Sequence, residues 1–253
     1  MKQSATCPKC GSIVTPDDIF CPQCGHQLKV EFYERLLPLF RRVPPSEIRP
    51  LSFIGKIKSF FIRPQLVYHD YMLSVRSFLP FLIVLFNVFL SVLYFEIIFF
   101  SNVPVISDLT IIEALISGLI IFFVNFIYTF IYFAVIALIA HLIVRLYEGH
   151  GKFKLTLNMT FISSFPLVIH KLIMLLFFMI TPLSVQGSLT LSVESFFESN
   201  AWILSQSLEI PFYVWMVILF TIGLRVGHKI STQDALIASI ASISLILLLR
   251  SFL

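Results

Sequence analysis

The C-terminal end of the chain constrains the fold most, because it holds two apolar runs joined by a short basic turn. The runs are Ile210–Leu224 and Ala235–Leu249, and the turn is Arg225–Gln233. The turn carries two fixed positive charges, and Ser231 and Thr232 are candidate N-caps for the helix that follows. This pattern is typical of a helical hairpin in a membrane, with its turn at the lipid surface.

Three further apolar runs precede this hairpin. A chain of 253 residues that is 58% hydrophobic and 13% charged would expose large apolar patches as a soluble domain. About 20 helical residues cross a hydrocarbon core of about 30 Å. The sequence therefore predicts an all-α polytopic membrane protein with five transmembrane helices. The predicted spans are Phe78–Phe100, Leu119–Val144, Leu157–Leu183, Ile210–Leu224 and Ala235–Leu249, and the last two are short unless flanking polar residues are included. In the fourth, Tyr213 and Trp215 are expected at the headgroup level.

Positive charge alternates between the loops. Lys and Arg lie before the first span, between the second and third, and between the fourth and fifth, whereas loops 101–110 and 184–209 contain neither. The positive-inside rule then predicts a multi-pass protein with a cytosolic N-terminus and a C-terminus outside. No cleavable signal peptide is expected, because the start MKQSATCPKC has no apolar core.

All four cysteines belong to two near-copies of the pattern CPxCG at the N-terminus. Each copy predicts a tight turn that directs two thiolates at one ion, with Gly11 and Gly25 where positive φ is commonly needed. Four thiolates form a closed tetrahedral zinc site, which is favoured here over free cysteines or an iron–sulfur cluster. The predicted structural zinc ligands are Cys7, Cys10, Cys21 and Cys24. The spacing indicates a reducing compartment, and residues 1–28 would depend on the metal to fold.

Residues 29–76 form a basic, proline-punctuated linker between this zinc ribbon and the membrane domain, residues 77–253. Phe32–Val43 has an apolar face, although Pro38 weakens it as one helix. Leu51–Ile62 places apolar residues at helical spacing, with Lys56 and Lys58 on the other side. These amphipathic juxtamembrane helices either lie on an anionic leaflet or dock onto the protein's own spans.

Three stretches of the chain resemble the Yip family, the Ypt/Rab-interacting membrane proteins. Phe60–Asp70 is similar to the family's lead-in, with a proline followed by an aromatic residue. Gly149–Lys154 with Pro166 resembles its Gly-rich turn and proline-containing third span. Trp215–Ala235 resembles its fourth-to-fifth hairpin. The resemblance covers Leu51 to the C-terminus and implies a cytosolic N-terminal segment followed by five spans. The zinc ribbon and the residues His170 and Lys171 within the third span depart from the family's pattern. The ribbon resembles those of many prokaryotic proteins, which indicates a prokaryotic type of Yip-family protein.

Several polar residues fall inside the predicted spans. Lys171 lies near mid-depth, where a lysine costs about 2.5–3.5 kcal/mol on insertion scales. Glu96 and Glu209 are its candidate partners, and a structural ion pair or a snorkelled lysine is favoured over a transport or proton-relay site. Interhelical hydrogen bonds are expected from a further set of polar side chains, Asn87, Asn125 and His141.

Small residues on the last two spans predict close helix packing, either within the hairpin or between copies in an oligomer. They are Gly223, Gly227, Ala235, Ala238, Ser239 and Ser242.

Two classes of function follow. The chain carries no nucleotide-binding, hydrolase or metalloprotease motif, so no enzyme is expected. The preferred hypothesis is a membrane adaptor or organiser, whose zinc-ribbon head engages a cytosolic protein partner or anionic lipid; binding of nucleic acid is not expected. The alternative is a small transporter or channel-like protein that uses the Lys171/Glu96 region. That alternative requires inward-facing polar residues at a shared depth on several helices.

Overall fold

A computed structural model of the protein describes residues 5–14, 21, 23–24, 26, 28, 32–44, 47–74, 78–102, 111–180 and 200–251. Within these ranges, the side chains at 5, 94–102, 111–115, 117, 200–202, 205 and 249–251 are outside the description. The elements in chain order are β1 (Ala5–Thr6), β2 (Ile13–Val14), α1 (Phe32–Leu36), the 3-10 helix η1 (Pro38–Phe40), α2 (Phe53–Ile62), α3 (Pro64–Leu73), α4 (Leu79–Asn102), α5 (Ile111–Leu146), α6 (Phe153–Ser163), α7 (Phe165–Ile180), α9 (Asn200–His228) and α10 (Thr232–Ser251).

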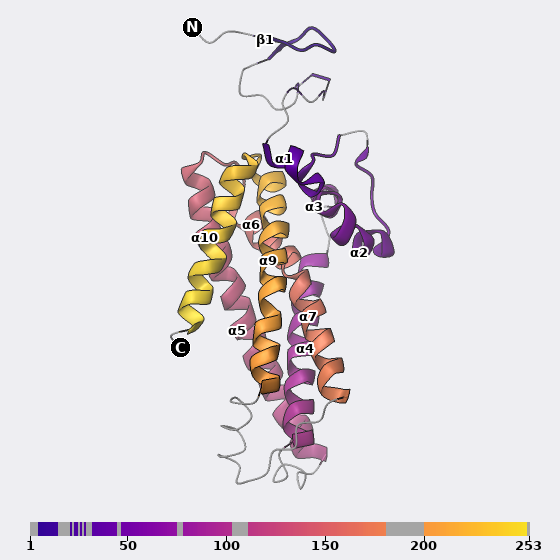
Figure 1. Ribbon diagram of the computed structural model, residues 1–253, viewed down its shortest axis with the longest axis vertical. Helices are drawn as coiled ribbons and strands as arrows, with labels where there is room; N and C mark the ends of the chain where they lie inside the picture. Colours follow the sequence, from indigo (N-terminus) through magenta and orange to yellow (C-terminus); the bar gives the residue numbers. More distant parts are fainter. Residues whose placement is uncertain are drawn as a thin grey trace.

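The protein is an all-α polytopic membrane protein, as predicted. Its long helices form an elongated bundle, and a small antiparallel pair, β1 and β2, precedes it (Figure 1). Among the described residues, three helical segments are long and apolar enough to cross a membrane: Gly118–Leu146, Phe153–Ile180 and Gln206–His228. Two shorter apolar segments, Leu79–Leu93 and Thr232–Leu248, lie at the positions of the first and last predicted spans.

The third predicted span is broken by a proline. Helix α6 ends at Ser163 and α7 begins at Phe165, with Pro166 in its first turn. Ser164 fills the gap, and its hydroxyl donates to the carbonyl of Phe161 at 2.8 Å. Since proline lacks a backbone donor and its ring collides with the preceding turn, the chain changes direction here.

The fourth predicted span starts too late. Helix α9 begins at Asn200, and its apolar part begins near Gln206 rather than at Ile210. The physical reason is that α9 continues through Pro211, with earlier polar residues such as Glu209 inside the helix rather than in a loop. The side chain of Tyr213 is buried in the bundle, and its place at the headgroup level stays a prediction.

Helix α9 packs against α3, α6, α7 and α10. The two glycines of α9 face α3 and α6. A Cβ on Gly223 would lie 2.7 Å from a ring carbon of Tyr68, and one on Gly227 would lie 3.3 Å from Leu155. The small residues of α10 are fully buried within the chain: Ala235, Ala238, Ser239 and Ser242. Close approach thus occurs inside one protomer, and the alternative of an oligomer surface is not needed to explain these residues.

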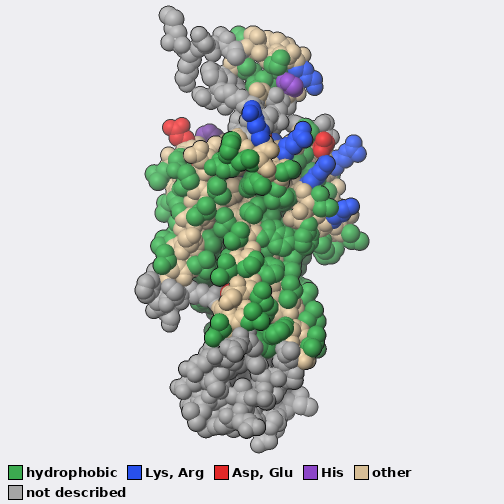
Figure 2. Space-filling view, in the orientation of Figure 1, with side chains coloured by type: hydrophobic (Ala, Val, Ile, Leu, Met, Phe, Trp, Pro, Cys, Tyr) green, Lys and Arg blue, Asp and Glu red, His purple; other side chains and the backbone are tan. Residues whose placement is uncertain are grey.

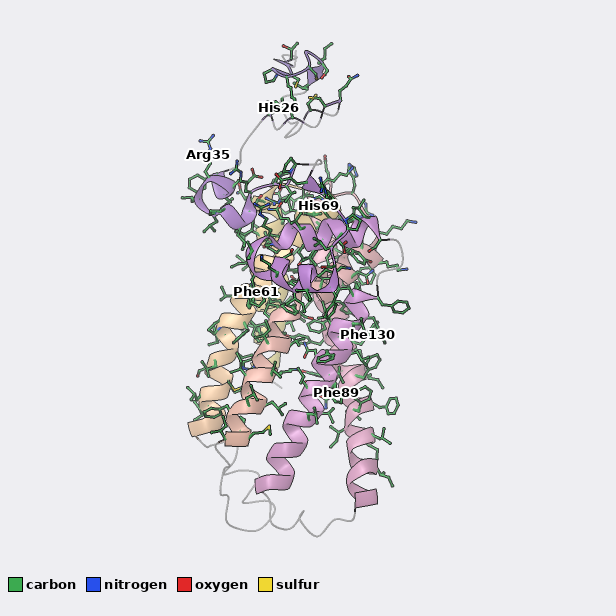
Figure 3. The ribbon with its side chains drawn as sticks, turned by 90° about the vertical axis from the view of Figure 1, so that its right-hand side faces the viewer. His26, Arg35, Phe61, His69, Phe89 and Phe130 are labelled. Carbon is green, nitrogen blue, oxygen red and sulfur yellow. The ribbon has the colours of Figure 1, made fainter. Side chains whose placement is uncertain are left out.

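Charged side chains gather at one end of the bundle. In the face shown in Figure 2, the Lys, Arg, Asp and Glu side chains of the described residues lie at the end where α1 to α3 sit, and a hydrophobic band follows. The turns between α5 and α6 and between α9 and α10 meet at the same end, because His150 N–H donates to the carbonyl of His228 at 3.2 Å. Figure 3 shows His26 and Arg35 toward this end and Phe89 and Phe130 farther along the bundle.

Candidate functional site

The four cysteines converge on one point in the N-terminal hairpin. Their Sγ atoms all lie within 4.8 Å of one another, and no other described side chain belongs to the cluster. The Sγ atoms of Cys7 and Cys24 are 3.6 Å apart, and those of Cys10 and Cys21 are 3.5 Å apart. Gly11 follows the first pair at φ 72°, as predicted, and its N–H donates to the carbonyl of Cys7. Gly25 lies outside the described residues.

This arrangement fits a metal ion better than a hydrophobic core. Among the described residues of the ribbon, only Cys7, Val14 and Cys21 are buried, with Cys24 and Leu28 packed against them. Such a core is too small to fold a segment of this length. Four thiolates around one point match the closed ligand set of a structural zinc, whose binding would supply the folding free energy. The cluster is thus a metal-binding site by its donor chemistry.

A second polar cluster joins the juxtamembrane segment to α9. Arg225, which is 2% exposed, donates from Nη1 to the carbonyl of Phe40 at 2.6 Å and to Oγ1 of Thr232 at 3.0 Å. The same Nη1 lies 3.5 Å from Oε1 of Glu34, to which Arg42 Nε also donates at 2.9 Å. The basic turn predicted at Arg225 is therefore wrong at this residue. Its guanidinium is buried in a network with an acid rather than exposed in a loop.

The neighbouring helices extend this docking. Gln65 accepts from the N–H of Val43 at 3.2 Å and donates to the carbonyl of Leu39 at 3.1 Å. Asp70 accepts from the N–H of Leu51 and pairs with Lys56, both at 2.8 Å. Burial and the charge of Arg225 lower the pKa of His69, so this ring is neutral at pH 7 and adds no second positive charge beside Arg225. The α1–α3 segment is thus held by buried polar contacts.

Helix α2 faces two ways. On its inner side, Phe60 stacks on Phe165 of α7, with ring centroids 4.2 Å apart. Phe61 meets Trp215 of α9 at 5.0 Å. The structure thus shows the docking alternative directly. Other apolar side chains of α2 are exposed, and they are Phe53, Ile54, Ile57 and Ile62.

The two turns at this end are joined by histidines. His141 Nδ1 lies 2.8 Å from Oγ1 of Thr156, and His228 Nε2 lies 2.9 Å from the same oxygen. His228 Nδ1 donates to the carbonyl of His150 at 2.8 Å. A Cβ on Gly151 would lie 2.7 Å from the His228 ring, so this glycine permits the contact. The interhelical hydrogen bond predicted for His141 is confirmed.

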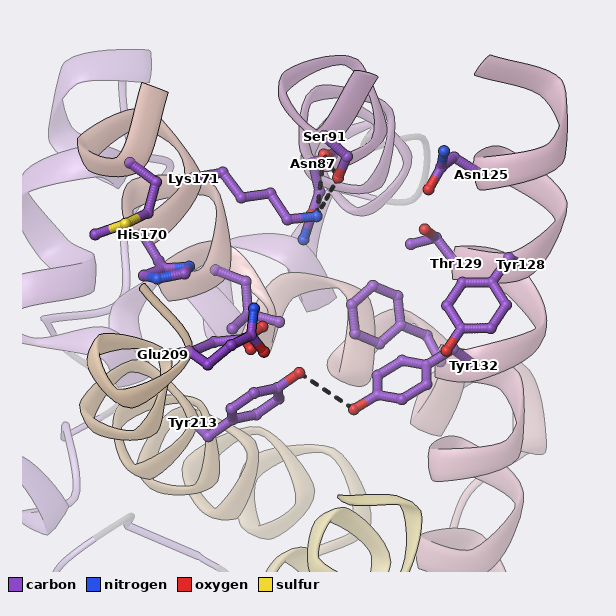
Figure 4. A pocket seen from close by; sticks show the side chains of 14 residues that line it. Asn87, Ser91, Asn125, Tyr128, Thr129, Tyr132, His170, Lys171, Glu209 and Tyr213 are labelled. Carbon is purple, nitrogen blue, oxygen red and sulfur yellow. Dashed lines mark hydrogen bonds between the residues drawn. The ribbon is translucent and has the colours of Figure 1, made fainter. Parts of the chain in front are cut away.

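Inside the bundle, four helices line a cavity of about 250 Å³. Figure 4 shows side chains from α4, α5, α7 and α9 around it. Lys171 reaches across from α7 to α4, where its Nζ donates to Asn87 Oδ1 and to Ser91 Oγ. The hydroxyls of Tyr132 on α5 and Tyr213 on α9 are 3.4 Å apart. Further polar lining comes from Asn125, Tyr128, Thr129, His170, Gln206 and Glu209.

Comparison with known families fits both parts of the chain. The model of the Yip1 domain matches residues 58–253, and that of a zinc-ribbon domain matches residues 3–28. The chain belongs to the Yip1 family. Neither the search of curated proteins nor that of solved structures gave a match. The Yip1 domain thus includes the second half of α2, all of α3 and the helix bundle.

The Yip1 domain brings together some predicted residues and not others. Asn87 contacts Lys171 as an interhelical partner, whereas Asn125 donates to the carbonyl of Ile121 in its own helix at 3.1 Å. Glu209 shares the cavity with Lys171, and the side chain of Glu96 lies outside the described residues.

Two features of the protein were not predicted from the sequence. One is the pairing of Glu34 with Arg225, and the other is the polar lining that α5 contributes to the cavity. The only signal for the second was polar residues spaced at 125, 129 and 132, which fall on one face of a helix.

Proposed function

We propose that this Yip1-family protein is a membrane adaptor, in which the spans hold a basic platform at the cytosolic surface and the zinc ribbon projects from it toward a protein partner. The observation that carries this proposal is the buried network of Arg225, Glu34 and Arg42. It links the segment just after the ribbon to the hairpin that ends the chain, so the head is attached to the bundle at a defined place. A flexible tether would not need such contacts.

The exposed side of α2 adds a lipid-binding element to this platform. Exposed aromatic and aliphatic side chains at Phe53 and Ile54 favour insertion between headgroups. Lys56 and Arg63 have acid partners within the chain, Asp70 and Glu47. Lys58 is exposed, and a lysine near an anionic leaflet contributes about 1 kcal/mol to binding.

We propose that Cys7, Cys10, Cys21 and Cys24 bind one structural zinc ion. Metal analysis of the purified, reduced protein is expected to give one zinc per chain. In a variant with Cys21→Ser and Cys24→Ser, zinc is expected to be lost while the helical content of the bundle is kept. A metal content near zero in the unmodified protein would refute the assignment.

The same variant tests the adaptor function. Proteins that co-purify with the unmodified chain are expected to be lost from the cysteine variant. The matched control is Thr6→Ala, at an exposed position of β1, which keeps all four thiolates. If the same partners are recovered from all three proteins while reconstituted protein moves solute across vesicles, the adaptor function is wrong.

The orientation in the membrane is a separate proposal, with the N-terminus cytosolic and the C-terminus outside. It is supported by the gathering of basic side chains at the end that bears α1 to α3. In a cysteine-free variant, single cysteines at Ser188 or Ser199, which lie outside the described residues, should react with impermeant reagents in intact cells. A cysteine at the exposed Lys152 should be protected. The reverse labelling would invert the orientation.

A second candidate function, a small transporter, is favoured by the cavity. A transporter requires inward-facing polar side chains on several helices. Four helices, α4, α5, α7 and α9, contribute polar side chains to the lining of this cavity. Lys171→Met in proteoliposomes is the test, because flux through the cavity would fall while insertion stays unchanged. Equal flux in the variant and the unmodified protein would remove this candidate.

A further inference from the structure

The cavity carries both signs of charge within the apolar part of the bundle. Lys171 enters from α7 and Glu209 from α9, and both side chains point into the space that Figure 4 shows. Ionisable residues at such depth are costly and commonly mark a ligand or ion pathway. One lysine and one glutamate face the same space, so the ionised forms of these two side chains carry opposite charges. A lone anion would meet Glu209, and a lone cation would meet Lys171.

The α4 wall supplies a buried hydrogen-bond donor that no other described residue accepts from. Asn87 is 1% exposed, and its Oδ1 accepts from Lys171. Its Nδ2 is buried and has no hydrogen-bond partner among the described residues. A buried amide without a partner is unfavourable, so an acceptor beside Asn87 and Lys171 would be stabilised. An anionic oxygen is the acceptor that suits both groups.

The rest of the lining suits a short carbon skeleton. Phe133, Leu167 and Met174 contribute apolar surface to the same space. The paired hydroxyls of Tyr132 and Tyr213 close one side of it. The volume of about 250 Å³ has room for several waters or one small solute, and it is below the usual size of a site for a drug-like molecule.

We propose that this cavity is a binding site for a small zwitterion, whose anionic group is received by Lys171 and Asn87 and whose ammonium group is received by Glu209. Two sources carry this chemistry: a free amino acid, and the phosphoethanolamine headgroup of a lipid entering from the bilayer. The proposal names a ligand for the cavity of the second candidate function. It concerns binding alone, so it is measured without flux and stands if no transport occurs.

The test uses the full-length protein in nanodiscs of phosphatidylglycerol, with calorimetric titration of five probes. The probes with both signs of charge are glycine and phosphoethanolamine, and the controls with one sign of charge are acetate, phosphate and ethanolamine. Glycine or phosphoethanolamine is expected to bind tenfold or more tightly than each of the three controls. Lys171→Met and Glu209→Gln should each weaken that binding at least tenfold. The control Ser207→Ala, on an exposed part of α9 outside the cavity, should leave it unchanged.

A second arm distinguishes the two sources. If the ligand is a lipid headgroup, nanodiscs containing phosphatidylethanolamine will suppress binding of the soluble zwitterions. Native mass spectrometry will then show this lipid retained by the unmodified protein and lost from Lys171→Met. Equal affinity for phosphate and phosphoethanolamine would overturn the proposal in favour of a simple anion site. Absence of both soluble binding and lipid retention would also overturn it. The ranking of probes on the unmodified protein decides the matter even if a variant fails to fold.

Discussion

Arg225 and Lys171 are both cations on apolar helices, but their surroundings differ. Arg225 donates to a carbonyl and a hydroxyl and lies beside the carboxylate of Glu34, and this cluster belongs to the packed core where α1 and η1 meet α9. Lys171 is solvated by two side chains of α4 and opens onto a cavity that it shares with Glu209. The first arrangement fixes two segments together. The second leaves room for something to bind.

The two sites offset the desolvation cost of a buried charge in different ways. At Arg225, the carboxylate of Glu34 and buried hydrogen bonds offset this cost. Removing Arg225 or Glu34 therefore leaves the other charge buried without its partner. At Lys171, the oxygen atoms of Asn87 and Ser91 and the polar lining of the cavity offset the desolvation cost. Water or a ligand in the cavity can rearrange when Lys171 is substituted. Substitutions at the two sites should therefore differ in size and in kind.

The largest effect is expected from Arg225→Met. Breaking a buried ion pair by removing one partner costs about 3–5 kcal/mol, and Glu34 would lose one of its two arginines here. Thermal unfolding in detergent should show a marked loss of stability, and hydrogen exchange in α1 and η1 should increase. The matched control is Arg35→Met, on an exposed position of α1. Equal stability of the two variants would mean that the network does not hold the juxtamembrane segment.

Combining Arg225→Met with Glu34→Leu sharpens this result. If the two side chains act as a pair, the double variant should be less destabilised than the sum of the single variants. Strict additivity would show that their contact at 3.5 Å carries little coupling.

The second largest effect is expected from a substitution that disturbs the packing of α3 on α9. Gly223→Ala places a methyl group 2.7 Å from the ring of Tyr68, which is buried and hydrogen-bonded through its hydroxyl to Ser163 at 2.7 Å. Overpacking of this kind costs about 1–3 kcal/mol. Gly227→Ala is the control, because its methyl group would meet the flexible ends of Leu155 and Met159, each at 3.3 Å, and should cost less. Unfolding in detergent would measure both; the reverse order would contradict the packing of α3 on α9.

A smaller effect on stability is expected from Lys171→Met. The substitution removes a buried charge and keeps a flexible chain of similar length, so stability should change by about 1 kcal/mol or less and can rise. Ligand binding in the cavity should nevertheless be lost. A destabilisation as large as that of Arg225→Met would show that Lys171 is a structural residue, and the contrast drawn between the two cations would fail.

The smallest effect is expected from Tyr132→Phe. Its hydroxyl lies 3.4 Å from that of Tyr213, and interhelical hydrogen bonds in membranes average about 0.6 kcal/mol. Thermal unfolding should therefore change little, whereas affinity for a zwitterion should fall if these hydroxyls contact the ligand. Tyr128→Phe on the same helix is the comparison, because it tests a second hydroxyl in the lining.

The sequence was informative where a pattern is local. Apolar runs longer than a soluble helix needs determined the class of protein, because backbone groups in lipid must be satisfied within a helix. The doubled CPxCG pattern determined which side chains can meet a metal ion, because each turn brings two cysteines together over four residues. Pro166 marked the break in the third span, and Ser231 marked the start of α10, where its hydroxyl accepts from the N–H of Asp234 at 3.1 Å.

Only the tertiary structure decided which charges meet. Glu34 and Arg225 are far apart in the chain, and nothing in either local pattern selects the other as its partner. The cavity likewise depends on the rotation of α4, α5, α7 and α9 about their axes, which places Asn87, Lys171 and Glu209 around one space. In a uniformly apolar helix the hydrophobic periodicity is weak, so the sequence gives each residue a depth but not a facing direction. Packing against the neighbouring helices sets that direction.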